Sequence, residues 1–188
     1  DNGELLEGVP MRDILIAPPT SAFKRVAELR GTVAATSSAK TIANMFRAYP
    51  TRPCLGFEVE TDKVAKMEKG GESFTKSVFA WKSFAQVHTH ARAVLDLLKR
   101  NNIEKGSLIG ICGENCTSYC EVALGCLLGE YVLVPLSTHL TLESQQHCIK
   151  EAQLGAVFVS NTYTEVYTTA IASAGVEGAC KLFTWCDE

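Results

Sequence analysis

Apolar residues recur in four evenly spaced runs through the second half of the chain. The runs cover residues 107–112, 131–136, 155–160 and 179–184, so each begins 24 residues after the one before. Short, nearly continuous apolar runs are typical of buried strands. Each gap of 18 residues is long enough for a crossover helix between parallel strands. The pattern therefore predicts an α/β fold with a largely parallel sheet flanked by helices.

Helical patterns precede the first of these runs and fill the gaps between them. Ser83 and Gln86 form a capping-box pattern at the start of one helix. Thr141 is expected to cap a second helix, and a third is expected to run from an N-cap at Asn161 to Gly175 in the left-handed conformation. The positions expected to face the core are Phe84, Val87, Ala91, Val94, Leu95 and Leu98 in the first helix, Leu142 and Ile149 in the second, and Tyr163, Val166, Tyr167, Ala170, Ile171 and Ala174 in the third.

The amino-terminal part of the chain is less regular. Residues 1–50 are predicted to be an irregular segment with one short helix at 41–48, and residues 51–188 to form the α/β subdomain. A β-hairpin is expected to begin this subdomain, with strands at 55–60 and 74–81. The charged, glycine-bearing insert between them, residues 61–73, is predicted to be a mobile surface loop. The apolar face of the short helix would consist of Ile42, Met45, Phe46 and Tyr49.

Composition and charge narrow the class of protein. With 46% hydrophobic and 21% charged residues, the chain can bury one sizeable core. Its net charge of -3 gives no reason to expect nucleic acid or an anionic membrane as a partner, and its basic residues are scattered and are not expected to form a common surface. The most apolar stretch, residues 122–136, is interrupted by Glu130 and is shorter than the ~20 residues of a spanning helix. With no signal peptide at residues 1–10, a cytosolic protein, or one peripheral on the cytosolic face of an organelle membrane, is expected.

Candidate chemical groups are few. Residues 34–41 imitate a nucleotide phosphate loop, but alanines stand at both required glycine positions. His88 and His90 are interpreted as satisfied or solvated helix residues, and Glu121 and Glu130 as isolated carboxylates. The eight cysteines lack C-x-x-C spacing and are expected to be reduced thiols in the core, with no metal: Cys54, Cys112, Cys116, Cys120, Cys126, Cys148, Cys180 and Cys186.

Several segments, in order, resemble the long-chain acyl-CoA synthetases of the adenylate-forming superfamily. Residues 79–87 (FAWKSFAQV) are similar to that family's Trp-x-Ser segment, and residues 103–111 (IEKGSLIGI) to its G-D-x-V-x-I strand, with Asn115 at its following Asn. Residues 132–141 (VLVPLSTHLT) resemble its V-P-L segment, and residues 153–160 (QLGAVFVS) its next strand. The resemblance implies the first subdomain of the adenylate-forming fold, truncated before the phosphate loop.

The resemblance also implies an activity for the full-length protein. In that family a fatty-acid carboxylate attacks ATP to give an acyl adenylate and pyrophosphate, and the thiol of CoA then displaces AMP. ATP, Mg²⁺ and CoA are thus the expected cofactors and a fatty acid the expected substrate. The family's phosphate loop, acidic T-E motif, ribose-binding Asp and catalytic Lys do not occur in these 188 residues. No catalytic, cofactor-binding or metal residue is therefore assigned, and the isolated chain is expected to be inactive and prone to self-association where the rest of its own chain would pack.

A different class of protein fits the same pattern. The chain would then be a free-standing α/β module that binds a ligand or a partner through the loops after its strands. These loops are residues 113–115, 137–139 and 160–161. In open parallel sheets the carboxyl ends of the strands are the usual ligand site.

Overall fold

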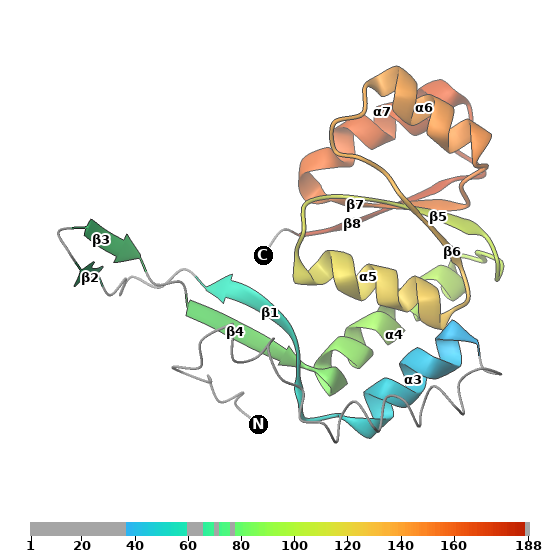
Figure 1. Ribbon diagram of the computed structural model, residues 1–188. Coiled ribbons are helices and arrows are strands. Elements are labelled where there is room, and N and C mark those ends of the chain that lie inside the picture. The colour runs from blue at the N-terminus through green and yellow to red at the C-terminus, as the bar shows by residue number, and fades with distance from the viewer. Residues whose placement is uncertain (1–36, 60–65, 70–71, 76–77, 187–188) are drawn as a thin grey trace.

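Figure 1 shows a parallel sheet between two layers of helices, and this sheet has four strands. The computed structural model describes residues 37–59, 66–69, 72–75 and 78–186. In that part of the chain the sheet consists of β5 (Leu108–Cys112), β6 (Val132–Pro135), β7 (Ala156–Ser160) and β8 (Lys181–Trp185). Its strands follow the order β6-β5-β7-β8 and every pair is parallel. The predicted parallel sheet is confirmed, with each strand beginning one or two residues later than its apolar run.

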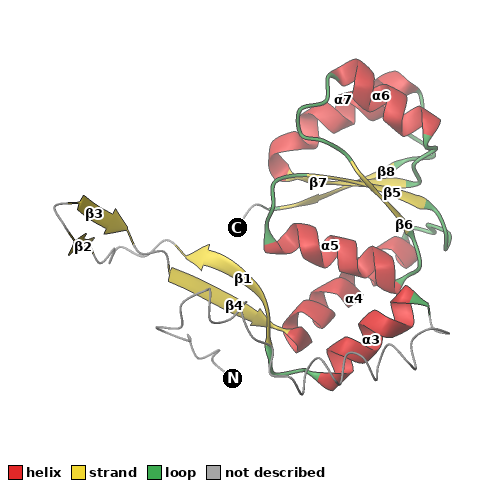
Figure 2. Cartoon of the chain, in the orientation of Figure 1, coloured by secondary structure: helices red, strands yellow, loops and turns green. Residues whose placement is uncertain are grey.

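Different helices cover the two faces of this sheet (Figure 2). One face carries α4 (Phe84–Arg100) and α5 (Thr117–Leu128), with α3 (Ser38–Ala48) packed outside them. The opposite face carries α6 (Leu142–Glu151) and α7 (Thr164–Ala174). No helix in the part of the chain that the structure describes is long and apolar enough to cross a bilayer.

Alternating strand residues divide the core into two halves. Ile109, Ile111 and Phe158 belong to the cluster beneath α4 and α5, whereas Val157 and Val159 belong to the cluster beneath α6 and α7. This alternation follows from the two-residue period of a strand, which points neighbouring side chains to opposite faces. All five residues of β7 are buried, because both of its faces are covered.

Local capping signals set most of the helix boundaries. The capping box at α4 is present, with Ser83 N donating to Gln86 Oε1 (2.7 Å) and Gln86 N to Ser83 Oγ (3.3 Å). Thr141 caps α6, and Gly175 ends α7 with φ at 69°, as predicted. The predicted cap at Asn161 is wrong.

The chain forms a 3-10 turn before α7 instead. This turn, η1 (Asn161–Tyr163), is capped by Ser160, and α7 begins only at Thr164 without a side-chain cap. The sequence alone could not distinguish the two starts, because Ser160 and Asn161 are both good capping residues. Two positions predicted to face the core, Leu142 and Val166, are exposed to 40% and 41%. Both lie in the first turns of their helices.

The predicted hairpin is present, but its strands differ from the prediction. β1 (Pro53–Val59) pairs antiparallel with β4 (Val78–Ser83), and Phe57 lies opposite Ala80. Residues 61–73 are not simply a loop, because β2 (Lys66–Lys69) and β3 (Glu72–Thr75) pair as a second hairpin within and just beyond them. The prediction of a single strand at 74–81 is therefore wrong. Residues 74 and 75 belong to β3, whereas residues 78–81 belong to β4. The other residues of the insert lie outside the described residues.

The short amino-terminal helix begins earlier than predicted. α3 starts at Ser38 with Ser37 as its cap, so residues 38–40 extend the expected helix. Phe46 is buried, with 4% of its surface exposed, but Met45 on the same expected face is 45% exposed. Only one edge of the helix touches α4 and α5, which leaves the Met45 side in contact with solvent. The other predicted irregular residues, 1–36, lie outside the described residues.

The close approach of α4 and α5 depends on Gly125. A Cβ atom there would lie 2.6 Å from Ala91 O and 2.7 Å from Val94 Cβ. We expect Gly125→Ala to lower the free energy of unfolding by about 1–2 kcal/mol, because overpacking outweighs the better helix propensity of alanine. Chemical denaturation measures the change. Gly178→Ala is the matched control, since a Cβ there meets no atom within 4 Å; equal effects of the two substitutions would contradict the packing explanation.

Candidate functional site

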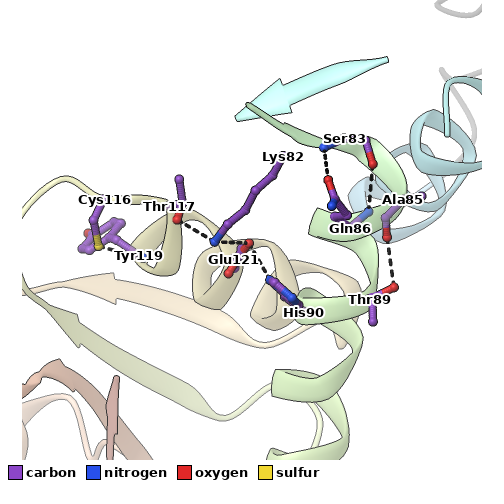
Figure 3. Close-up of polar contacts among 10 residues, drawn as sticks. All are labelled: Lys82, Ser83, Ala85, Gln86, Thr89, His90, Cys116, Thr117, Tyr119 and Glu121. Carbon is purple, nitrogen blue, oxygen red and sulfur yellow. Dashed lines mark hydrogen bonds and ion pairs between the residues drawn. The ribbon is translucent and has the colours of Figure 1, made fainter. Parts of the chain in front are cut away.

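A buried ion pair joins the hairpin to the α/β body. Lys82 Nζ lies 3.2 Å from Glu121 Oε1 and donates to Thr117 Oγ1 at 2.8 Å (Figure 3). His90 Nδ1 contacts the same Glu121 oxygen at 2.8 Å. β4 provides the lysine, α4 the histidine, and α5 both the threonine and the glutamate. The cluster of Lys82, His90, Thr117 and Glu121, here called the polar junction, therefore connects three elements.

Burial gives the polar junction its importance. The side chains of Glu121 and Lys82 are only 8% and 14% exposed, whereas that of His90 is 50% exposed. A buried carboxylate requires a charged or hydrogen-bonding partner, since desolvation of an unpaired charge is costly. Thr117 and Glu121 are four residues apart on α5 and therefore share a face. The interpretation of Glu121 as an isolated carboxylate is wrong.

The sequence held a signal for this contact. Glu121 lies within an otherwise apolar helix, CEVALGCLL, where a charged residue predicts a buried partner. His90 was expected either to be hydrogen-bonded or to be exposed to solvent. Its ring is half exposed and also contacts Glu121, so both descriptions apply. Chemically, a Glu–His contact could move a proton. Here Lys82 occupies the same carboxylate, so the arrangement is suited to holding the hairpin on the body.

The other two groups singled out in the sequence have separate surroundings. Glu130 is exposed and forms an ion pair with Lys105, whose hydrogen bond and positive charge lower the pKa of Glu130. His88 stacks on Phe46 with ring centroids 4.8 Å apart. Partial burial, together with the charges of Arg92 and Arg47, lowers the pKa of His88.

A second candidate site lies at the carboxyl ends of the parallel strands. The chain leaves β5 toward β6 on one side and leaves β7 toward β8 on the other, so the adjacent ends of β5 and β7 form a topological switch point. Ligands of open α/β sheets usually bind at such a point. Tyr163 joins the three loops named from the sequence: its hydroxyl donates to Glu114 Oε1 (3.0 Å) and is hydrogen-bonded to the Thr138 side chain. The hydrogen bond to Glu114 raises the pKa of Tyr163.

An indole ring fills part of this switch point. A Cβ atom on Gly113 would lie 2.5 Å from Trp185 Cζ2, so only glycine leaves room for the ring. Trp185 is 9% exposed and packs edge-on against Tyr119 with ring centroids 6.2 Å apart. Its Nε1 atom is buried and has no hydrogen-bond partner among the described residues. Neither Trp185 nor Tyr163 was identified from the sequence as part of a site.

The imitation phosphate loop is not arranged as a cradle in its described part. Ser37 Oγ accepts a hydrogen bond from Lys40 N (3.4 Å), and Ala39 is buried at the start of α3. The backbone donor that a phosphate would use at this helix start is therefore already bonded to the capping hydroxyl. The remaining residues of the imitation loop, 34–36, lie outside the described residues.

Most of the cysteines lie in or against the core, as expected. Cys112, Cys126 and Cys180 are buried, and burial raises the pKa of Cys126 to about 12 and that of Cys180 to about 11. Cys186 is exposed, contrary to the expectation for a core residue. Among the residues that the structure describes, no three His, Cys, Asp or Glu side chains are grouped as metal ligands.

Comparison with known proteins identifies the family. The profile of the AMP-binding enzymes matches residues 61–183. Long chain acyl-CoA synthetase 1 of Arabidopsis thaliana is 26% identical over 84 residues, which are 45% of this chain and 13% of that protein. The chain thus spans a small part of the length of this curated relative.

Solved structures show the same fold. The adenylation domain of a carboxylate reductase from Mycobacterium chelonae has a TM-score of 0.62 at 18% identity, covering 76% of this chain and 22% of that one. The A-PCP didomain of carboxylic acid reductase from Segniliparus rugosus, in complex with AMP, has a TM-score of 0.64 at 17% identity, covering 79% and 21%. ATP-bound MatB from Rhodopseudomonas palustris has a TM-score of 0.51 at 19% identity, covering 57% and 20%. The predicted first subdomain of the adenylate-forming fold is confirmed.

The polar junction predicts a large effect of removing its carboxylate. We expect Glu121→Gln to lower the free energy of unfolding by about 3 kcal/mol, because Lys82, only 14% exposed, would lose its ion pair with a buried carboxylate. In a Lys82→Met background the same change is expected to cost much less, which a double-mutant cycle measures. Glu130→Gln breaks the exposed pair with Lys105 and is the matched control, expected to leave stability unchanged. Additive single effects would contradict a coupled ion pair.

The stacking of His88 on Phe46 predicts a pH dependence. Because the pKa of His88 is lower in the folded protein than its ordinary value of 6.5, the unfolded chain binds the proton first. The contribution of His88 to stability is therefore complete above pH 6.5 and is lost as the pH falls from there to the lowered pKa. Thermal melts of wild type and His88→Gln, followed from neutral to acidic pH, should therefore converge on acidification. A constant difference between wild type and His88→Gln would disprove this dependence.

Proposed function

The chain belongs to the AMP-binding enzyme family, and from this premise we propose that its full-length protein is an ATP-dependent fatty-acid–CoA ligase. The observation that carries the proposal is the family match over residues 61–183, which includes the sheet order β6-β5-β7-β8. The long-chain acyl substrate rests on the Arabidopsis thaliana relative and on the similar Trp-x-Ser and V-P-L segments. In the reaction, the fatty-acid carboxylate attacks ATP, and the CoA thiol then displaces AMP from the acyl adenylate.

This chain contributes a scaffold in that proposal. Its described residues offer no cradle of free backbone donors at the imitation phosphate loop, since Ser37 already caps the helix start. We therefore assign the binding of ATP, Mg²⁺ and CoA to other parts of the full-length protein, and we derive no catalytic step from residues of this chain. The chain's part is to hold the rigid sheet on which those other parts pack.

Surfaces of the described residues support this packing role. Val132 on the edge strand β6 is 48% exposed, and the opposite edge strand β8 has no described partner on its outer side. Edge strands with exposed apolar residues readily pair with further chain. We propose that the rest of the chain packs along the sheet, and that the isolated chain self-associates in its absence.

Activity assays test separately the adenylation step, the CoA ligation step, the acyl-chain preference and the scaffold role of residues 1–188. Full-length protein and residues 1–188 alone are each mixed with ATP, Mg²⁺ and palmitate, octanoate or acetate, with and without CoA. We expect acid-dependent pyrophosphate exchange and CoA-dependent AMP release from the full-length protein, strongest with palmitate, and no turnover by residues 1–188. The isolated chain lacks positioned phosphate donors, and positioning supplies most of the rate in such reactions.

Each other outcome contradicts a specific statement. Exchange without CoA-dependent AMP release would support adenylation but reject CoA ligation. A preference for acetate would reject the long-chain substrate. Turnover by residues 1–188 would reject the scaffold role, and a full-length protein inactive with all three acids would count against ligase activity altogether.

A further inference from the structure

Basic residues that are scattered in the sequence gather on one layer of the structure. Residues 37–52 and 84–105, which include α3 and α4, contain seven Lys and Arg residues and only two carboxylates. The whole chain has a net charge of -3, so this layer differs strongly from the average. The expectation that basic residues form no common surface is therefore wrong for this layer. We define the basic surface as Lys40, Arg47, Arg92, Lys99 and Lys105, all of which are exposed.

Shared neighbours connect these five residues into one surface. The charges of Arg92 on α4 and Arg47 on α3 both lower the pKa of His88. Lys99 and Lys105 line the same hollow of about 320 Å³ at the ends of α4 and α5. Lys40 and Lys105 both act on Glu130. The basic surface thus continues from the end of α3, along α4, to the loop before β5.

The carboxylates near the basic surface do not neutralise it. Glu130 is paired with Lys105, and Asp96 lies one turn from Arg92 on α4. Glu104 precedes Lys105 in the chain. With these three carboxylates counted against the seven Lys and Arg residues, an excess of four positive charges remains.

The opposite layer has the reverse charge. Residues 137–180, which contain α6 and α7, hold four carboxylates and one lysine. Figure 1 shows α3 and α6 at opposite ends of the molecule, with the sheet between them. The charge of the molecule is therefore asymmetric, with positive charge on the α3–α4 layer and negative charge on the α6–α7 layer. A negatively charged plane would attract the first layer and repel the second.

We propose that the full-length protein docks on an anionic membrane through the basic surface. The cations are spread out rather than convergent: Lys40 and Arg47 are seven residues apart on α3, or about 10 Å along its axis. Such spacing matches several lipid headgroups in a plane better than a single phosphate. Met45, 45% exposed on the same helix, offers an apolar side chain to the headgroup region. The proposal does not depend on the ligase activity.

Vesicle sedimentation of the full-length protein tests the docking without substrate or ATP. Vesicles of phosphatidylcholine alone are compared with vesicles that contain about a third of phosphatidylserine. We expect binding only to the anionic vesicles, with loss at high salt because the Debye length falls from about 8 Å at physiological ionic strength to about 3 Å at 1 M. Arg47→Glu with Arg92→Glu should weaken the partition at least tenfold.

A charge-matched pair of single variants serves as the control. Lys150→Glu makes the same change of charge as Arg47→Glu but on α6, where this lysine is exposed, and should leave binding unchanged, whereas Arg47→Glu alone should weaken it. Equal weakening by these two single variants would show that net charge alone acts, and would overturn the assigned surface. Equal binding to neutral vesicles, or no binding to either kind, would overturn the membrane as the partner. Circular dichroism confirms that each variant is folded.

Discussion

Burial of the central strands between two helical layers is the constraint on which this structure depends. β7 is buried along its whole length, and β5 is buried at all but its first residue. The backbone groups of such strands must be paired on both sides, which the neighbours β6 and β8 provide. Covering both faces requires helices that alternate with the strands. The order of elements, the divided core and the position of the loop ends all follow from this one requirement.

The polar junction solves a different problem, which is how to fix the hairpin. A two-stranded hairpin is marginally stable by itself and needs packing against something else. Lys82, the second-last residue of β4, provides a charge-assisted contact to α5, and its Nζ also lies 5.8 Å above the ring of Phe57. Glu121 needs that lysine equally, because it is buried among apolar residues of α5. The hairpin and the helix are therefore each stabilised by the other.

The surroundings of the described titratable side chains agree with the proposed scaffold role of this chain. The described titratable groups with the largest changes in pKa, such as Cys126, are changed mainly by burial rather than by a partner suited to catalysis. At the switch point, where an open sheet would usually bind a ligand, Trp185 packs against Gly113. The fold places three loops together there through the contacts of Tyr163 with Glu114 and Thr138.

The sequence by itself determined the elements and their parallel arrangement, while the tertiary structure decided which side chains meet. Strand runs, the capping box at Ser83 and the left-handed Gly175 act over a few residues, so their patterns are visible in a short stretch of sequence. Glu121 meets Lys82 and His90 from 39 and 31 positions away, and its carboxylate gave no local sign of which partners it would find. The β2–β3 hairpin, the exposure of Met45 and the basic surface were missed for the same reason. Each depends on which elements pack against it, and packing is decided by the burial of the whole sheet rather than by neighbouring residues.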